Sequence, residues 1–461
     1  MKVLLTHGYF LNDDPKEMEI MKPYVPLGIL YIAGYLEREK IETEVFDSTF
    51  QSYGLQLAYI NKYQPNVIGL YTNLMTKVNV IRLVKSLRAD EKTKHIKLIL
   101  GGPDLTYNQV DYLNTGVDAL VIGEGELTFT QLVNHWGKNP NQKPENIDGV
   151  SFLNIKNELV KNKPRQKVKE LSELTLPARH KVNLHLYLDT WKKHHGASSI
   201  TLSTQRGCPY TCKWCSTAVY GQSYRRRKPQ EVIDEMVFLN HEYKPDHFWF
   251  VDDVFTVSHR WLKEFADLIS EQGVKVQFEC ISRADRMNKE VLSLLQKAGC
   301  FRVWIGAESG SQKIIDAMDR RVDVNMVREM IQLAQTYNIE AGTFIMIGYP
   351  GETIEDINKT IHHLKVSNPS SYTITKAYPI KGTGLFDDVE ETMIYNFDWQ
   401  TSTDRDRDFK RTYASKFYDY AARYVVNEVE SYKDLSSKKY YHFLKKKIKS
   451  SLSRLMMEIH K

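Results

Sequence analysis

The sequence predicts an α/β protein that has two parallel-sheet domains and a helical C-terminal region. Three observations predict it: two stretches in which short apolar runs alternate with helical spacing, a polar stretch between them, and a strand-free helical pattern from about residue 395 onward. Strands that alternate with helices form parallel sheets, whose ligands bind at the carboxyl ends of the strands. With 461 residues, the chain is long enough for several domains, each with its own core.

The first series predicts a doubly wound, Rossmann-like sheet over residues 1–138. Residues 27–40 have the spacing of a helix, and five apolar runs are expected as strands: 2–6, 44–47, 66–71, 96–102 and 119–123. The ends of these strands are expected to bring five small residues to one edge of the sheet: Thr72, Gly101, Gly102, Gly123 and Gly125.

The second series, over residues 196–390, predicts a partial (β/α)6 barrel of the TIM type. Its six strands are expected at residues 199–203, 247–251, 274–278, 302–306, 342–347 and 371–375. Chemistry in such barrels takes place at the carboxyl ends of the strands. Residues 139–195 are expected as a linker, and residues 391–461 as a basic helical region.

Composition excludes several classes of protein. With 42% hydrophobic and 26% charged residues, the chain is neither disordered nor fibrous. Five cysteines in so long a chain exclude a disulfide-stapled secreted fold. The first residues lack the apolar core of a signal peptide, and no apolar run is long enough to span a membrane. We therefore expect a cytoplasmic protein.

Three of the five cysteines, Cys208, Cys212 and Cys215, lie within eight residues, directly after the first predicted barrel strand. Zinc would usually require a fourth ligand nearby. Three thiolates at these spacings suit a 4Fe-4S cluster that leaves one iron open. The alternative is three incidental buried cysteines.

The motif Cys-x-x-x-Cys-x-x-Cys after the first strand of a partial barrel resembles that of the radical S-adenosylmethionine (SAM) enzymes, over roughly residues 196–390. The resemblance implies that the open iron binds SAM, and that an electron from an external flavodoxin- or ferredoxin-type reductant cleaves SAM to an adenosyl radical. By position, it also implies SAM contacts from seven residues: Tyr210, Trp214, Asp252, Asp253, Arg283, Glu308 and Ser309. Helix capping is the alternative role for each aspartate. Met318–Arg321 stands where many relatives carry Lys-Gly, which departs from the family pattern.

The N-terminal domain resembles the cobalamin-binding domain, whose pattern is Asp-x-His-x-x-Gly, then Ser-x-Leu, then Gly-Gly. Thr72-Asn73-Leu74 matches the second element, and 26 residues separate it from Gly101-Gly102. The first element falls on Val25–Leu30, where Leu27 replaces the histidine, so the resemblance implies cobalamin without a lower histidine ligand. The implied contacts are Leu27, Thr72, Asn73, Leu74, Gly101, Gly102, Gly123, Glu124 and Gly125. A domain that has lost cobalamin and serves as a scaffold is the alternative.

Together these features predict a cobalamin-dependent radical SAM enzyme that methylates a poorly activated carbon of a small molecule or peptide. One alternative is an oxidative cyclase or rearranging enzyme in which cobalamin is not the methyl donor or is absent. Another is a non-catalytic iron–sulfur binding protein. A nucleic-acid partner is not expected, because no nucleic-acid-binding motif is present.

The positive charge is concentrated at the C-terminal end, where residues 401–461 contain 15 Lys and Arg but only 8 Asp and Glu. Five apolar residues recur there at helical spacing: Leu444, Ile448, Leu452, Leu455 and Ile459. Such a basic amphipathic helix is typical of peripheral membrane contact. More often such a helix docks on the core and leaves its charged face in water.

Overall fold

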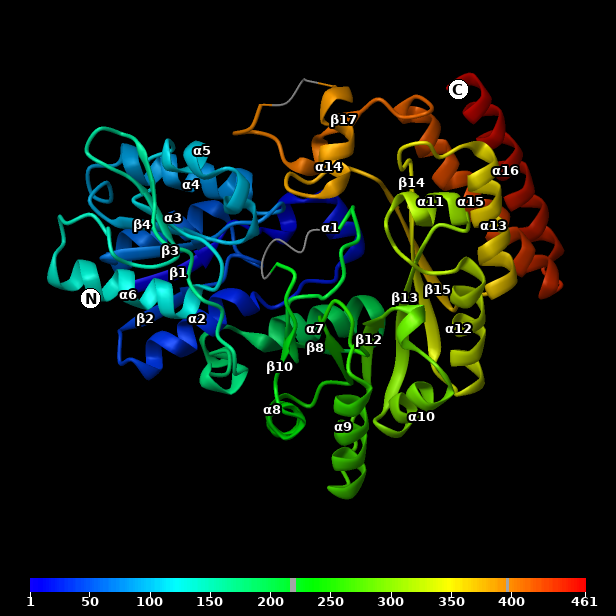
Figure 1. Cartoon of the computed structure of the whole chain (residues 1–461), viewed down its shortest axis with the longest axis horizontal. Helices are drawn as coiled ribbons and strands as arrows, with labels where there is room; N and C mark the ends of the chain where they lie inside the picture. Colours follow the sequence, from blue (N-terminus) through cyan, green and yellow to red (C-terminus); the bar gives the residue numbers. More distant parts are fainter. Residues whose placement is uncertain (216–220, 395–397) are drawn as a thin grey trace.

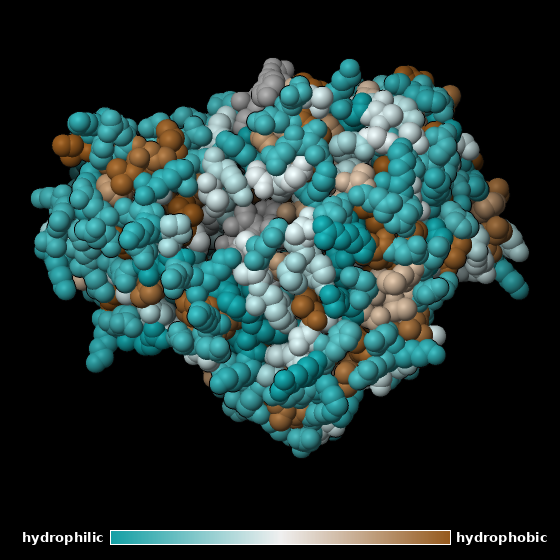
Figure 2. All heavy atoms as spheres, in the orientation of Figure 1, coloured by the Kyte–Doolittle hydropathy of each residue, from teal (hydrophilic) through white to brown (hydrophobic). Residues whose placement is uncertain are grey.

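The computed structural model describes residues 1–215, 221–394 and 398–461. Two sheet domains lie side by side, and two long C-terminal helices form the outermost layer of the second (Figure 1). No helix in these ranges is long and apolar enough to cross a membrane. The surface is largely hydrophilic, and one of its hydrophobic patches lies on the right-hand rim in Figure 2, where Figure 1 places the last helix, α16 (Tyr440–Ile459).

The N-terminal domain is built on a seven-stranded sheet in the order β2-β1-β3-β4-β5-β6-β7. Its first five strands run parallel. The strands are β1 (Val3–His7), β2 (Thr43–Phe46), β3 (Val67–Tyr71), β4 (Lys97–Gly101), β5 (Ala119–Val121), β6 (Val150–Leu153) and β7 (Leu159–Lys161). The helices are α1 (Pro15–Ile20), α2 (Leu27–Arg38), α3 (Tyr53–Tyr63), α4 (Lys77–Ala89), α5 (Gln109–Leu113) and α6 (Gly125–Lys138).

Helices cover both faces of this sheet, which confirms the doubly wound prediction. Apolar residues of α2 and α6 form one core with one face of the strands, and those of α3, α4 and α5 form a second core with the other. All five residues of β1 are buried, as expected for a central strand covered on both sides.

The expected linker, residues 139–195, is more ordered than its polar composition indicates. β6 pairs antiparallel with β5, and β7 pairs antiparallel with β6, so both strands extend the N-terminal sheet. Val150 and Phe152 are buried in its core. They anchor the strands although the surrounding residues are polar. A helix, α7 (Leu184–His195), then leads into the second domain.

The second domain confirms the partial barrel. Six parallel strands follow the order β15-β14-β13-β12-β11-β8. They are β8 (Ser199–Leu202), β11 (His247–Phe250), β12 (Phe278–Ser282), β13 (Cys300–Glu308), β14 (Glu340–Ile347) and β15 (Ser371–Lys376). The helices are α8 (Pro229–Tyr243), α9 (His259–Glu271), α10 (Lys289–Lys297), α11 (Gln312–Ala317), α12 (Val324–Thr336), α13 (Ile354–Ser367) and α14 (Gly384–Val389).

One predicted barrel strand is displaced along the chain. The strand expected at residues 274–278 lies at Phe278–Ser282. Val274 and Val276 pack against the core only partly buried, whereas Phe278 and Cys280 are fully buried in the sheet. The alternation of apolar residues continues through both segments, so periodicity alone did not locate the strand. Arg283 still follows the strand directly, as predicted.

The region after the barrel joins both domains. The segment that carries α14 and β17 (Asp408–Phe409) lies above the space between them in Figure 1. Lys381 there donates a hydrogen bond to Asn108 of the N-terminal domain (3.2 Å). Further on, α15 (Ser415–Ser436) packs on α13, and α16 packs on α15. The C-terminal region is therefore integral to the fold.

Candidate active site

The cysteine loop begins at a short hairpin above the barrel. β9 (Gln205–Arg206) pairs antiparallel with β10 (Arg225–Arg226), and the cysteines follow β9. Gly207 has a φ of +82°, and a Cβ there would lie 2.2 Å from the carbonyl oxygen of Ser223. Only glycine permits this close approach, so Gly207 closes the loop that presents Cys208.

Asp252, two residues after β11, holds the start of this loop through hydrogen bonds. Its carboxylate accepts hydrogen bonds from the backbone N–H groups of Thr204 (2.8 Å) and Gln205 (3.2 Å) and from the hydroxyl of Ser203 (3.2 Å). Burial raises its pKa, although nearby Arg226 and these donors oppose the shift. Both carboxylate oxygens already bond to the protein, so the structure makes Asp252 a positioning residue for the cysteine loop.

Asp253 differs sharply from its neighbour. It forms no hydrogen bond or ion pair with any residue in the described ranges, and it lines a cavity of about 560 Å³ that also reaches Cys208. Desolvation raises its pKa, and the adjacent Asp252 adds to the shift. Of the two aspartates predicted to contact SAM, Asp253 is the one whose carboxylate is available to a ligand.

Two buried guanidinium groups approach Cys212. Nη1 of Arg283 lies 3.5 Å from its Sγ, and Nη1 of Arg320 lies 3.6 Å from it. Arg283 is held by an ion pair with Asp285 (2.8 Å) and stacks on the ring of Tyr210 (4.0 Å). Cations at this distance offset the negative charge of a metal-bound thiolate. Arg320 was not among the predicted site residues; its only signal in the sequence was the departure from Lys-Gly at Met318–Arg321.

Glu308 ends β13 in a strained conformation. Its φ is +62°, and the pairing of β13 with β14 shifts register between Gly306 and Glu308. Burial raises its pKa, while Arg320, 3.6 Å away, opposes the shift. Strain of this kind persists where the surrounding structure enforces it, often at functional sites. Trp214 lies on the same side of the barrel, and its buried Nε1–H has no partner among the described residues.

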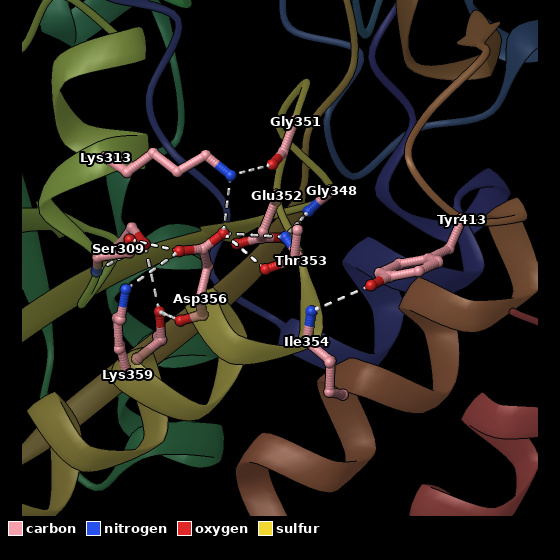
Figure 3. A network of polar contacts seen from close by, with 12 residues as sticks. Ser309, Lys313, Gly348, Gly351, Glu352, Thr353, Ile354, Asp356, Lys359 and Tyr413 are labelled. Atoms are coloured by element: carbon pink, nitrogen blue, oxygen red, sulfur yellow. Dashed lines mark hydrogen bonds and ion pairs between the residues drawn. The ribbon is translucent and has the colours of Figure 1, made fainter.

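Ser309 is part of a network that joins the ends of β13 and β14 (Figure 3). Its hydroxyl lies 3.3 Å from that of Thr360 and accepts a hydrogen bond from the N–H of Ser311 (3.2 Å). Asp356 accepts hydrogen bonds from the hydroxyls of Ser311 (2.6 Å) and Thr353 (3.0 Å). The Ser309 hydroxyl is therefore engaged within the protein, and its predicted contact with SAM stays a prediction.

Glu352 of this network is expected to make stability depend on pH. Its carboxylate accepts a hydrogen bond from the N–H of Gly348 (2.6 Å), and burial raises its pKa from 4.5 to about 8. The folded protein retains this proton between those pH values while the unfolded chain has lost it, so stability falls as pH rises through this window and is constant above it. The expected loss is a few kcal/mol.

Thermal unfolding of the wild type and of Glu352→Gln, from about pH 5 to about pH 9, tests this expectation. The variant should lose much of the alkaline decrease in Tm. Glu355→Gln, a solvent-facing change in the first turn of α13, should behave like the wild type. An equal decrease in all three proteins would contradict the assigned role of Glu352.

The three cysteines fit an iron–sulfur cluster. All are free thiols, and burial raises the pKa of Cys215 to about 12, with further contributions from Asp253 and the other two cysteines. Thiols that interact in this way lose their protons when a metal binds. No three His, Cys, Asp or Glu in the described part of the chain converge on one point, as ligands of a single ion would. A cluster instead takes each thiolate on a different iron.

The N-terminal domain faces this loop with a glycine-lined groove of about 90 Å³. A Cβ built on Gly101 or Gly123 would meet no atom within 4 Å, so both glycines border open space. Gly102 has a different role: its φ is +127°, and a Cβ would lie 2.0 Å from the carbonyl oxygen of Thr72. Gly125, beside Ile32, also lines the groove. Glycine lets a ligand approach the backbone closely, so these positions suit contact with part of a large cofactor such as cobalamin.

The first turn of α2 is the meeting point of three cavities. Gly28 lines the glycine groove, the cavity at Cys208 and a third cavity of about 400 Å³. Leu27 lines the last two. The residue aligned with the missing histidine therefore lies where a corrin would meet the barrel, and its aliphatic side chain offers no ligand atom for cobalt.

The three residues of the Thr72–Leu74 segment have different surroundings. Thr72 donates its N–H to Gly101 (2.7 Å), and its buried hydroxyl has no partner among the described residues. Asn73 lines the 400 Å³ cavity and accepts a hydrogen bond from the N–H of Met75 (2.9 Å). Leu74 borders a separate cavity beside Arg405. Thr72 and Asn73 therefore lie closer than Leu74 to the predicted cobalamin site.

The acidic residues of Gly123–Glu126 form ion pairs that join the two domains. Glu124 pairs with Arg225 (2.7 Å) and accepts a hydrogen bond from the N–H of Val168 (2.9 Å), and Glu126 pairs with Arg206. Arg206 and Arg225 belong to the hairpin that starts the cysteine loop. These ion pairs therefore orient the cysteine loop toward the glycine groove. The sequence did not indicate this role for Glu124.

This geometry defines a class of protein: a two-domain enzyme with a three-cysteine cluster site on a partial barrel, facing a second domain shaped for a large cofactor. Residues 202–364 match the family model of the radical SAM superfamily, and residues 19–133 match that of the B12 binding domain. The chain belongs to the radical SAM superfamily, in the group that carries a B12-binding domain. Its cofactors are accordingly a 4Fe-4S cluster, SAM and cobalamin.

Known proteins resemble the chain over most of its length. It is 26% identical to an uncharacterized methyltransferase of Pyrococcus horikoshii, over 82% of this chain and 81% of the relative. It is 22% identical to the anaerobic magnesium-protoporphyrin IX monomethyl ester cyclase of Rubrivivax gelatinosus, over 86% and 72%. The structure of the cobalamin-dependent SAM radical enzyme OxsB superposes with a TM-score of 0.77 at 14% identity, over 98% of this chain and 72% of OxsB. OxsB therefore shares the fold.

Proposed function

We propose that this protein transfers a methyl group to a poorly activated carbon of a small molecule or peptide. The observation that carries the proposal is the 560 Å³ cavity, whose wall includes Cys208 and Asp253 of the barrel and Leu27 and Gly28 of the N-terminal domain. A substrate in this cavity is in reach of both cofactor sites. One cavity that spans two cofactor sites suits a reaction that uses both.

When bound, the cofactors supply hydrogen-atom abstraction from carbon and a transferable methyl group. The chain's own residues bind and orient them. Asp253 is placed to accept hydrogen bonds from the amino group of SAM, and Arg283 and Arg320 balance the negative charge of the thiolates. Leu174, Leu176 and Phe238 add apolar surface to the cavity wall, which a bound substrate would cover.

The relatives support two reactions to different degrees. The Pyrococcus relative aligns over most of both chains and is named a methyltransferase, which favours methylation. The cyclase of Rubrivivax favours the alternative, an oxidative ring closure in which cobalamin does not donate methyl. Leu27 bears on the choice, because its side chain would offer a bound corrin no nitrogen donor, which would suit a cobalamin that supplies a methyl group.

The proposal includes partners and location. The cluster needs one-electron reduction, which a flavodoxin- or ferredoxin-type protein would supply. We place the enzyme in the cytoplasm. Nucleic acid is not among the proposed substrates. Contact with a membrane surface concerns a different face of the molecule, at α16.

The stoichiometry of SAM consumption tests the proposal. The reconstituted protein is incubated anaerobically with cobalamin, SAM, dithionite and a small-molecule extract of host cells. Methylation is expected to form 5′-deoxyadenosine and S-adenosylhomocysteine in equal amounts over many turnovers, together with a product one CH2 heavier than its substrate. Sustained 5′-deoxyadenosine formation with no S-adenosylhomocysteine beyond one equivalent per enzyme would establish the cyclase alternative. Absence of both products would exclude an enzyme of either kind.

A further inference from the structure

The last helix, α16, docks on α15 through an unusual face. Its buried residues are Ser450, Ser453 and Met457, two of which are small and polar. The contact is reinforced by charge: Lys447 pairs with Glu428 of α15 (2.7 Å), whose carboxylate also accepts a hydrogen bond from the hydroxyl of Ser450 (2.6 Å). Burial opposes ionisation of Glu428, but Lys365, Lys447 and Ser450 outweigh it and hold its pKa at about 2. The orientation of α16 is therefore well determined.

This orientation turns the apolar side of α16 outward. Leu444, Ile448, Leu452, Leu455 and Ile459 are 57–63% exposed, and Tyr441 is 74% exposed. We call these six residues the apolar stripe. They follow one another at intervals of three and four residues, so they form one continuous strip about 25 Å long. An exposed apolar surface of this kind marks an interaction site.

The charges beside the stripe indicate its partner. Lys445 and Lys449 follow the stripe along one side and form no ion pair with any residue the structure describes, unlike Lys446 and Lys447, which pair with α15. Two unpaired lysines at the edge of an apolar helix face complement an anionic surface. A second copy of this chain would instead bring like charges together, since α16 holds five Lys and Arg and a single acidic residue.

We propose that the apolar stripe of α16 docks this protein on the surface of an anionic lipid bilayer. The helix lies flat, its aliphatic residues enter the boundary between headgroups and acyl chains, and Lys445 and Lys449 contact lipid phosphates. The position of α16 permits this, because it is the outermost layer of the molecule (Figures 1 and 2) and contributes no residue to the three cavities of the described site. The inference does not depend on which reaction the site catalyses.

Co-sedimentation with vesicles tests the proposal on the full chain. Binding to vesicles of phosphatidylglycerol and phosphatidylcholine is expected to exceed binding to pure phosphatidylcholine about 10-fold and to weaken at high salt. The triple variant Ile448→Asn/Leu452→Asn/Leu455→Asn should lose about 10-fold or more of the binding to either vesicle. Lys445→Gln/Lys449→Gln should lose the preference for phosphatidylglycerol.

The matched control is Leu55→Asn/Val110→Asn/Ile155→Asn, which replaces three exposed aliphatic residues of the N-terminal domain (46–90% exposed). It should bind vesicles like the wild type. Failure of the wild type to sediment with phosphatidylglycerol vesicles overturns the proposal, as does equal loss in the control. A dimer in size-exclusion chromatography that the α16 triple variant dissociates also overturns it, because the stripe would then be covered by a second copy. Thermal unfolding confirms that the variants fold.

Discussion

Replacing Cys212 by alanine is expected to abolish the iron–sulfur cluster and all chemistry that depends on it. A cluster on three thiolates loses one of its three protein ligands, and Arg283 and Arg320 are left facing an empty position. Replacing a residue that only supports a metal ligand typically lowers metal affinity or activity by about 10- to 100-fold. Loss of a ligand itself should therefore lower 5′-deoxyadenosine formation by more than about 100-fold. Iron content and visible absorbance after anaerobic reconstitution measure the first effect, and chromatography of the nucleoside products measures the second.

Cys300→Ala is the matched control for this experiment. Cys300 begins β13 and is buried in the barrel core, away from the loop that carries the other three thiols. It should keep full iron content and lose about 1 kcal/mol of stability through the small cavity that it leaves. A Cys212→Ala protein with the iron content of the wild type would refute the assignment of the cluster site.

Replacing Gly101 by leucine is expected to expel cobalamin while sparing the barrel. The new side chain would extend into the groove, where the first added carbon meets no atom of the protein within 4 Å, so the domain should fold normally. Because the leucine side chain would fill the groove that Gly101 leaves open, retention of cobalamin should fall by at least about 10-fold. Corrin absorbance after gel filtration measures it, and 5′-deoxyadenosine formation in the same sample should remain near the wild-type rate.

Two control substitutions, Gly101→Ala and Gly102→Ala, test whether the loss of cobalamin comes from filling the groove. Gly101→Ala adds only one carbon to open space and should retain most of the cobalamin. Gly102→Ala should instead destabilise the domain, because its Cβ would collide with the carbonyl oxygen of Thr72. If Gly101→Leu retains cobalamin as well as the wild type does, the groove is not its site.

Much of this protein could be predicted from local patterns along the chain. Alternating apolar runs predicted the parallel sheets, and the spacing of Cys208, Cys212 and Cys215 predicted a cluster site, because both are properties of consecutive residues. Predictions failed where a segment's partner lies far away in sequence. β6 and β7 were expected as linker because their burial depends on joining β5, and β12 was placed too early because its neighbours in the sheet decide where pairing begins.

The roles of individual charged residues show the same division. The sequence predicted Asp252 and Asp253 together, and both line the cavity, yet only the fold shows that the carboxylate of Asp252 is held by the loop at Thr204. Glu124 was expected near cobalamin; it lines the glycine groove, and only the fold shows that it also pairs with Arg225. Adjacent residues of one type look alike in a sequence, and hydrogen-bond partners distinguish them.

By itself, the sequence determined the fold class, the cluster cysteines and the loss of the histidine at Leu27, because each depends on residue type and spacing alone. Only the tertiary structure decided that the cavity at Cys208 and the glycine groove meet at Gly28, and that α16 docks through its serines with its apolar stripe in solvent. The physical reason is that a helical pattern specifies which residues share a face, whereas the complementary charges and shapes of distant elements select the face that is buried.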